Sequence, residues 1–188
     1  MIEGPMLAAD GLLVIAVRTP DTPHRDAARH LVRQTLGKTL GEMLAVDEHS
    51  LSLLSQPGQG IRLAPPWQDI GISVSHEPGL SLAAIHRAGP VGIDLLRLGP
   101  PLPDLDRLAR DYLGPFTVAA LAALPATQRQ PAFAGAWCRL EAGLKCLGTP
   151  LGEWTPEIGQ QLAGCTYTDI AMPAGWVAAV AITACQAR

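Results

Sequence analysis

Residues 91–98 have the sequence VGIDLLRL, an apolar run typical of a buried strand that is interrupted by one carboxylate, Asp94. Gly92 has no side chain and would let another group approach the strand backbone closely. A buried carboxylate needs a partner, and a hard divalent cation such as Mg²⁺ is one. A helix cap or an ion pair with an arginine such as Arg97 would also serve, so Asp94 alone leaves both interpretations open.

A second charged pair lies in an apolar stretch further along, where residues 137–145 are WCRLEAGLK. We expect a helix over 131–147, with Pro131 in its first turn. Glu141 and Lys145 stand four residues apart, in the order that favours a surface ion pair worth a few tenths of a kcal/mol. The apolar residues beside them also allow a second interpretation, in which the pair lies at the edge of a cleft.

Apolar runs and turn residues predict the remaining elements. Each half of the chain follows the order strand, helix, loop, hairpin, which predicts two similar lobes, 1–89 and 90–188, that form one compact unit with a ligand cleft between them. Strands are expected over 11–18, 70–75, 80–85, 91–98, 166–171 and 176–183, helices after Pro23 and over 104–113, 117–124 and 131–147, with Gly37 and Gly148 as possible helix ends, a loop over 55–66 and a hairpin turn over 76–79.

The bulk composition excludes several classes of protein. Of 188 residues 48% are hydrophobic and 16% charged, which is too apolar for a disordered chain. A net charge of −3 makes nucleic acid an unexpected partner. No uncharged stretch approaches the roughly 20 residues that span a bilayer, and we expect a soluble protein without a signal peptide. Reduced thiols in a cytoplasm are expected because no Cys-x-x-Cys spacing joins the four cysteines, Cys138, Cys146, Cys165 and Cys185.

Three motifs, taken in order, point to a family. Residues 91–94 (VGID) followed by 137–145 resemble the paired signature of the 4′-phosphopantetheinyl transferases. Ser75-His76, before the second strand of a predicted hairpin, is similar to a further motif of that family and lies upstream as expected. Three ordered motifs are far more specific than any one of them. The resemblance implies an α+β (α/β) fold of two pseudo-symmetric lobes, each with a small, mostly antiparallel sheet and a packed helix.

The resemblance also implies an activity. The family transfers the 4′-phosphopantetheine arm of coenzyme A to a serine of an acyl or peptidyl carrier protein. Asp94 and Glu141 would hold Mg²⁺, Glu141 would take the serine proton directly or through a bound water, and Lys145 would stabilise the leaving phosphate. Ser75 and His76 would lie at a phosphate of coenzyme A. A hairpin-turn histidine without a ligand is the alternative for His76.

Basic residues provide the expected contacts to the rest of coenzyme A. Arg25, Arg29 and Arg33 are four residues apart and so lie along one side of a helix. By resemblance this side binds the 3′-phosphate, with Arg25 and Arg33 slightly favoured, and a solvated helix face is the alternative. Arg62 resembles a basic loop residue near the adenine, although Pro65 is displaced from the family's spacing.

Two positions depart from the family pattern. Leu96 stands where many members carry a second carboxylate, and Leu140 stands where the family usually has lysine. Arg139 is adjacent, but one residue along a helix turns the side chain by about 100°. A degenerate member that binds coenzyme A or a carrier protein without efficient turnover is therefore the main alternative, and another metal-dependent enzyme acting on phosphate esters is a second. A monomer is expected.

Overall fold

The N-terminal half forms a four-stranded antiparallel sheet with the strand order β1-β2-β6-β5. The computed structural model describes residues 4–9, 11–55 and 60–183, so Cys185 lies outside the described residues. The hairpin turn is shorter than expected, because β5 continues through His76 and Glu77 to a turn at Pro78-Gly79. The strands are β1 (Gly4–Ala9), which the sequence analysis did not predict, β2 (Leu12–Arg18), β5 (Gly71–Glu77) and β6 (Leu80–His86).

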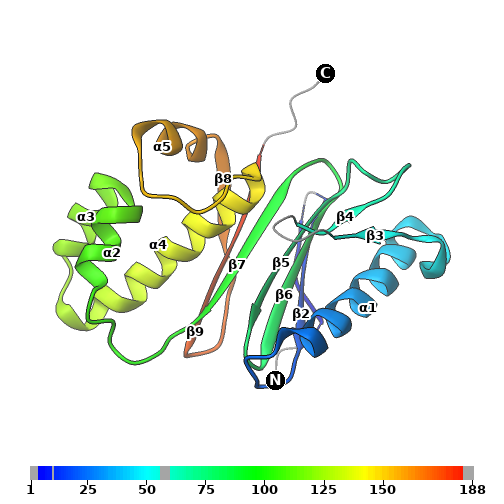
Figure 1. Cartoon of the computed structure of the whole chain (residues 1–188), viewed down its shortest axis with the longest axis horizontal. Coiled ribbons are helices and arrows are strands. Elements are labelled where there is room, and N and C mark those ends of the chain that lie inside the picture. Colours follow the sequence, from blue (N-terminus) through cyan, green and yellow to red (C-terminus); the bar gives the residue numbers. More distant parts are fainter. Residues whose placement is uncertain (1–3, 10, 56–59, 184–188) are drawn as a thin grey trace.

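Helix α1 (Arg25–Leu44) covers one face of this sheet (Figure 1). Its buried residues recur every four positions, at Ala28, Val32, Leu36 and Leu40, and the last three share an apolar cluster with odd-numbered residues of β2. Gly37 does not end the helix, contrary to expectation. The expected loop over 55–66 is wrong in part, because β4 (Arg62–Leu63) pairs with β3 (Leu53–Leu54) after a short 3₁₀ helix, η1 (Glu48–Ser50).

The C-terminal half forms a three-stranded antiparallel sheet in the order β7-β9-β8, with helix α4 packed on β7 and β9. Helix α4 begins at Ala126 and contains Pro131, so the expectation of Pro131 in the first turn was wrong. Gly148 ends it with φ 66°, as predicted. The elements are β7 (Val91–Arg97), α2 (Leu105–Tyr112), α3 (Gly114–Ala122), α4 (Ala126–Leu147), α5 (Pro156–Leu162), β8 (Cys165–Asp169) and β9 (Trp176–Thr183).

The two sheets have matching topologies. The elements β2, α1, β5 and β6 follow one another as β7, α4, β8 and β9 do, and the strand orders β2-β6-β5 and β7-β9-β8 correspond. Even-numbered residues of β2 and β6 share a buried apolar cluster with β7 and β9, so the halves have a common core. This is the predicted α+β fold class, with small antiparallel sheets and packed helices. The lobe boundary at residues 89 and 90 remains a prediction.

The described residues bear on two expectations, the absence of a membrane-spanning helix and the reduced state of the cysteines. No helix in the described ranges is both long and apolar enough to cross a membrane. Cys138, Cys146 and Cys165 are free thiols, consistent with the absence of a disulfide motif.

Candidate functional site

The two sheets meet where the edge strands β5 and β7 lie side by side (Figure 1). Side chains of β5 bind the backbone of β7 here, in place of an ordinary ladder between the two backbones. Alternate β5 side chains accept hydrogen bonds from alternate N–H groups of β7, so the strands run in the same direction. The pairs are Ser73 with Ile93 (3.1 Å), Ser75 with Leu95 (3.2 Å), and Glu77 with Arg97.

Asp94 lies at this junction and is buried, with 7% of its surface exposed. Its Oδ1 accepts hydrogen bonds from Ser75 Oγ at 2.9 Å and from Lys145 Nζ at 2.6 Å. The sequence left open an ion pair between Asp94 and Arg97. In the structure Arg97 pairs with Asp21 at 3.4 Å instead, so Lys145 is the cationic partner of Asp94.

Gly92 explains how Lys145 reaches Asp94. A side chain at Gly92 would place its first carbon 1.9 Å from the carbonyl oxygen of Ala142 and 2.4 Å from the backbone nitrogen of Cys146. The group that approaches the strand closely at Gly92 is therefore helix α4. Because α4 crosses β7 in contact with its backbone, the Lys145 ammonium also donates to the carbonyl of Ile93 at 3.1 Å.

Glu141 lies one helical turn before Lys145 and is half-buried. Burial raises the pKa of Glu141, the negative charge of Asp94 raises it further, and Lys145 lowers it. Since Lys145 forms its ion pair with Asp94, the surface ion pair considered for Glu141 and Lys145 is not the arrangement found.

Cys138 is a member of the site that the sequence analysis missed. It is fully buried and its thiol donates to the carbonyl of Val177 at 3.5 Å. Burial raises the pKa of the Cys138 thiol, and the negative charge and hydrogen bond of Asp94 raise it further. Cys138, Glu141 and Lys145 recur at the three- and four-residue spacing of one helix face, which is the signal that could have found it.

His76 lies in strand β5, not in the turn where the sequence placed it. Its Nδ1 is 2.7 Å from Ser81 Oγ. The pKa of His76 is lowered from 6.5 to about 4, mainly by burial and then by the charges of Arg25, Arg29 and Lys145 in that order. The imidazole is therefore neutral near pH 7, and the start of α1 faces it.

Arg33 and Arg62, the other two arginines expected to contact coenzyme A, have different surroundings. The guanidinium of Arg33 donates to the carbonyl of Leu53 and to Ser55 Oγ, the latter at 3.2 Å, and so supports the segment around β3. Arg62 is exposed on β4, in register with Leu54. The structure thus brings Arg25 and Arg29 toward His76, whereas Arg33 is engaged further along the helix.

Comparison with known proteins supports the same family. Residues 90–160, which include β7 and α4, match the family model of the 4′-phosphopantetheinyl transferase superfamily. The 4′-phosphopantetheinyl transferase HetI of Nostoc sp. is 32% identical over 122 residues, or 65% of this chain and 50% of that protein. These matches make the chain similar to the 4′-phosphopantetheinyl transferase superfamily over the part that contains β7 and α4. It spans about half the length of the curated relative that it matches.

Leu140 and Leu96, the two positions that depart from the superfamily pattern, lie in different surroundings. Leu140 is 7% exposed and packs with Phe133 and Leu144 in the apolar cluster beneath α2 and α3. Its neighbour Arg139 is held by both carboxylate oxygens of Asp169, at 2.8 and 2.6 Å, so it does not replace the missing lysine. Leu96 is half-buried on β7, two residues beyond Asp94, and so shares a face of the strand with it.

The donor set at the junction suits the magnesium ion that this superfamily implies. Carboxylate oxygens are hard ligands, and Mg²⁺ is usually held by one or two carboxylates together with waters and substrate phosphates. Asp94 and Glu141 provide two such groups. Across the described part of the chain no three His, Cys, Asp or Glu side chains form a ready-made metal centre. The two carboxylates thus fit Mg²⁺ by the chemistry of their oxygens.

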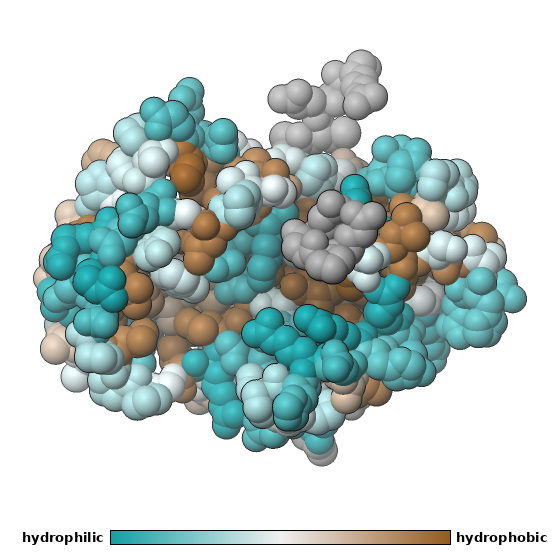
Figure 2. All heavy atoms as spheres, viewed as in Figure 1, coloured by the Kyte–Doolittle hydropathy of each residue, from teal (hydrophilic) through white to brown (hydrophobic). Residues whose placement is uncertain are grey.

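A separate hollow of about 880 Å³ lies among the C-terminal helices. Figure 2 shows apolar residues at the surface over this part of the molecule. Trp154 and Leu162 line the hollow, as does Phe116, which is 92% exposed. Neither Asp94 nor Glu141 lines it, so the hollow is distinct from the junction of β5 and β7.

Proposed function

We propose that this protein transfers the 4′-phosphopantetheine arm of coenzyme A to a serine hydroxyl of an acyl or peptidyl carrier protein and releases adenosine 3′,5′-bisphosphate. The observation that carries the proposal is the meeting of three motifs at Asp94. Ser75 of β5 and Lys145 of α4 both bind its Oδ1, at 2.9 and 2.6 Å. Ser75, Asp94 and Lys145 belong to three motifs that are far apart in the sequence, and the fold brings them together at one buried carboxylate.

Asp94 and Glu141 are the proposed ligands of Mg²⁺. When bound, the ion neutralises negative charge on the pyrophosphate of coenzyme A as its phosphorus–oxygen bond breaks. The two carboxylates come from β7 and α4, which the contact at Gly92 locks together. This rigid pairing supports their use as one site.

Glu141 is the proposed proton acceptor. The serine oxygen forms a bond to the β-phosphorus, the bond from that phosphorus to the bridging oxygen breaks, and the serine proton passes to Glu141. A half-buried carboxylate with a raised pKa is a stronger base than an ordinary surface glutamate. Lys145 places a cation beside the leaving phosphate, where negative charge collects.

Arg25, Arg29 and His76 are the proposed contacts to the phosphates of coenzyme A. Both arginines are exposed on the first turns of α1 and their charges act on His76. Guanidinium groups bind phosphate in a bidentate manner. A neutral His76 has its Nε2 available as a donor when Nδ1 accepts from Ser81, so it can bind a phosphate oxygen without carrying charge.

Mass spectrometry of apo carrier proteins incubated with the protein, coenzyme A and Mg²⁺ tests the proposal. We expect a phosphopantetheine adduct that disappears with excess chelator and in the Glu141→Gln variant. The alternative is a degenerate member that binds without turnover, and the buried Leu140 favours it. Coenzyme A binding by calorimetry with no adduct on any carrier would establish that alternative. The carrier, the monomeric state and the cytoplasmic location remain predictions.

A further inference from the structure

Glu77 is the one carboxylate of the β5–β7 junction to which the superfamily pattern gives no role here. It ends β5, two residues after Ser75, and so extends from the same side of the strand. Its carboxylate accepts the backbone N–H of Arg97, which belongs to the peptide bond that joins Leu96 to Arg97. Glu77 therefore places its charge next to Leu96, the position where many members of the superfamily carry their second carboxylate.

Asp94 interacts with two other carboxylates. It lies near Glu77 and Glu141, and its negative charge disfavours the ionised form of both. Lys145 supplies one positive charge directly on Asp94. A group of neighbouring carboxylates is the kind of environment that a divalent cation stabilises.

Two further cations act on Glu77 at longer range. Arg25 lies exposed at the start of α1, and Arg97 is paired with Asp21 and stacked on Trp176, with its guanidinium carbon 5.6 Å from the ring centre. The charges of Arg25 and Arg97 both lower the pKa of Glu77 and so favour its ionised form, which is the form that could act on a cation.

We infer that Glu77 is the third acidic group of the divalent-cation site and takes the place of the carboxylate that Leu96 lacks. The inference rests on the proposed function. Glu77 binds a water of the metal's hydration shell, because Mg²⁺ keeps several waters in protein sites. Glu77 is thus a positioning residue for the ion, with Asp94 and Glu141 as its direct ligands.

Metal affinity of the whole protein tests this inference independently of catalysis. Binding of Mn²⁺, followed by electron paramagnetic resonance of the free ion, and of Mg²⁺, followed by calorimetry, would be measured for wild type and Glu77→Gln. The amide keeps an oxygen that accepts the Arg97 N–H, so the strand end should persist. We expect metal affinity to fall at least about tenfold, as is typical when a residue in the outer shell of a metal is removed.

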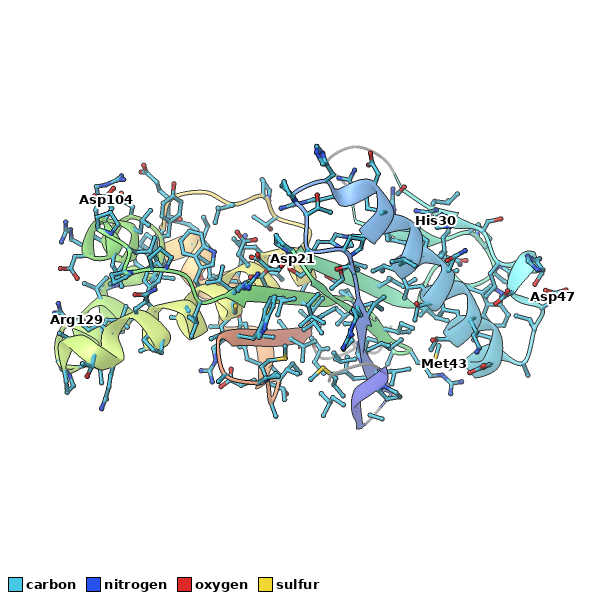
Figure 3. All side chains as sticks on the ribbon, turned by 90° about the horizontal axis from the view of Figure 1, so that it is seen from below. Asp21, His30, Met43, Asp47, Asp104 and Arg129 are labelled. Atoms are coloured by element: carbon cyan, nitrogen blue, oxygen red, sulfur yellow. The ribbon has the colours of Figure 1, made fainter. Side chains whose placement is uncertain are left out.

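Asp47→Asn is the matched control. It also replaces a carboxylate by an amide whose oxygen can still accept a backbone N–H, here that of His49, and Asp47 is exposed beyond α1 at one end of the molecule (Figure 3). We expect its metal affinity to stay within about twofold of wild type, since exposed charges are strongly screened. We further expect the added substitution Leu96→Glu to restore the metal affinity of Glu77→Gln.

The outcomes separate this inference from the proposed function. If Glu77→Gln binds both ions as tightly as wild type, or if Asp47→Asn weakens binding equally, the role of Glu77 is overturned while the transferase proposal stands. If Asp94→Asn, shown to be folded by a thermal melt, binds Mn²⁺ as well as wild type, then the metal site itself is overturned together with the inference.

Discussion

Lys145 Nζ lies 2.6 Å from Asp94 Oδ1 and joins helix α4 to the buried carboxylate of strand β7. The Asp94 side chain is 10% exposed and that of Lys145 32%, so water only partly screens the pair. The ammonium occupies one oxygen of a proposed metal ligand. Lys145 is therefore the partner of Asp94 when no metal is bound, and it competes with the metal cation for the Asp94 carboxylate.

Lys145→Met, which keeps most of the length of the side chain and removes its charge, tests both roles. We expect the free energy of unfolding to fall by about 1–3 kcal/mol without metal, because Asp94 keeps a hydroxyl partner but loses its cation. Added Mg²⁺ should raise the melting temperature of this variant more than that of wild type. Thermal melts with and without Mg²⁺ measure both, and Lys38→Met, at an exposed position of α1, is the control. If Mg²⁺ raised the melting temperature of variant and wild type equally, Lys145 and Mg²⁺ would not compete for Asp94.

Glu141→Gln separates catalysis from folding. We expect transfer to fall by at least about a hundredfold, as is usual when a general base is lost. Burial raises the pKa of Glu141, so its ionised form is less favourable in the folded protein than in the unfolded chain. Removing the charge should then leave the melting temperature at pH 7 unchanged or slightly higher. Transfer at the wild-type rate in this variant would remove the proposed base.

Arg25 and Arg33 should behave differently, although the sequence placed them on one helix side. Arg25→Ala should raise the KM for coenzyme A roughly tenfold or more relative to the 3′-dephospho form, through loss of about 1.5–3 kcal/mol of charge-assisted bonding. Arg33→Ala should leave that ratio unchanged and lower the melting temperature by a few degrees, because Arg33 holds Leu53 and Ser55. Steady-state kinetics with both substrates decide this. An equal loss on both substrates in Arg25→Ala would show a solvated helix face.

Ser73→Ala tests the side-chain ladder between β5 and β7. The substitution leaves the buried N–H of Ile93 without its acceptor, so we expect a loss of about 1–3 kcal/mol in urea unfolding. Metal affinity should not change, because Ser73 has no hydrogen bond to Asp94 in the described structure. Ser75→Ala should cost more, since Ser75 also donates to Asp94. Wild-type stability of Ser73→Ala would show that the ladder is dispensable.

His76 predicts a pH dependence of stability with a definite sign. The pKa of His76 is lowered from 6.5 to about 4, mainly by burial, so as the pH falls the unfolded chain takes up this proton first. The contribution of neutral His76 to the free energy of unfolding is complete above about pH 6.5 and declines as the pH falls toward 4. We expect a loss of order 1–2 kcal/mol, reduced because the ring is only half-buried. Chemical unfolding of wild type and His76→Gln across this range measures it, and the variant should show a shallower decline. Parallel profiles would contradict the assignment.

Local patterns determined most of the secondary structure. The apolar runs that became β2, β6, β7 and β9 are recognisable in one dimension because a strand with two buried faces needs a continuous apolar sequence. Strand β1, with the sequence GPMLAA, and helix α5, with PEIGQQL, were missed because neither has strong strand or helix periodicity.

By itself the sequence also determined which residue types carry the candidate chemistry, since Asp94, Glu141, Lys145 and the Ser75-His76 pair form motifs that need no coordinates to recognise. Only the tertiary structure decided their partners. Lys145 binds Asp94 and not Glu141 because α4 touches the backbone of β7 at Gly92, a contact between residues about fifty positions apart. Likewise Arg33 supports β3, and Glu77 faces Arg97, because edge strands and loops meet there. A helical repeat defines which residues share a face, but what that face meets depends on packing between distant segments.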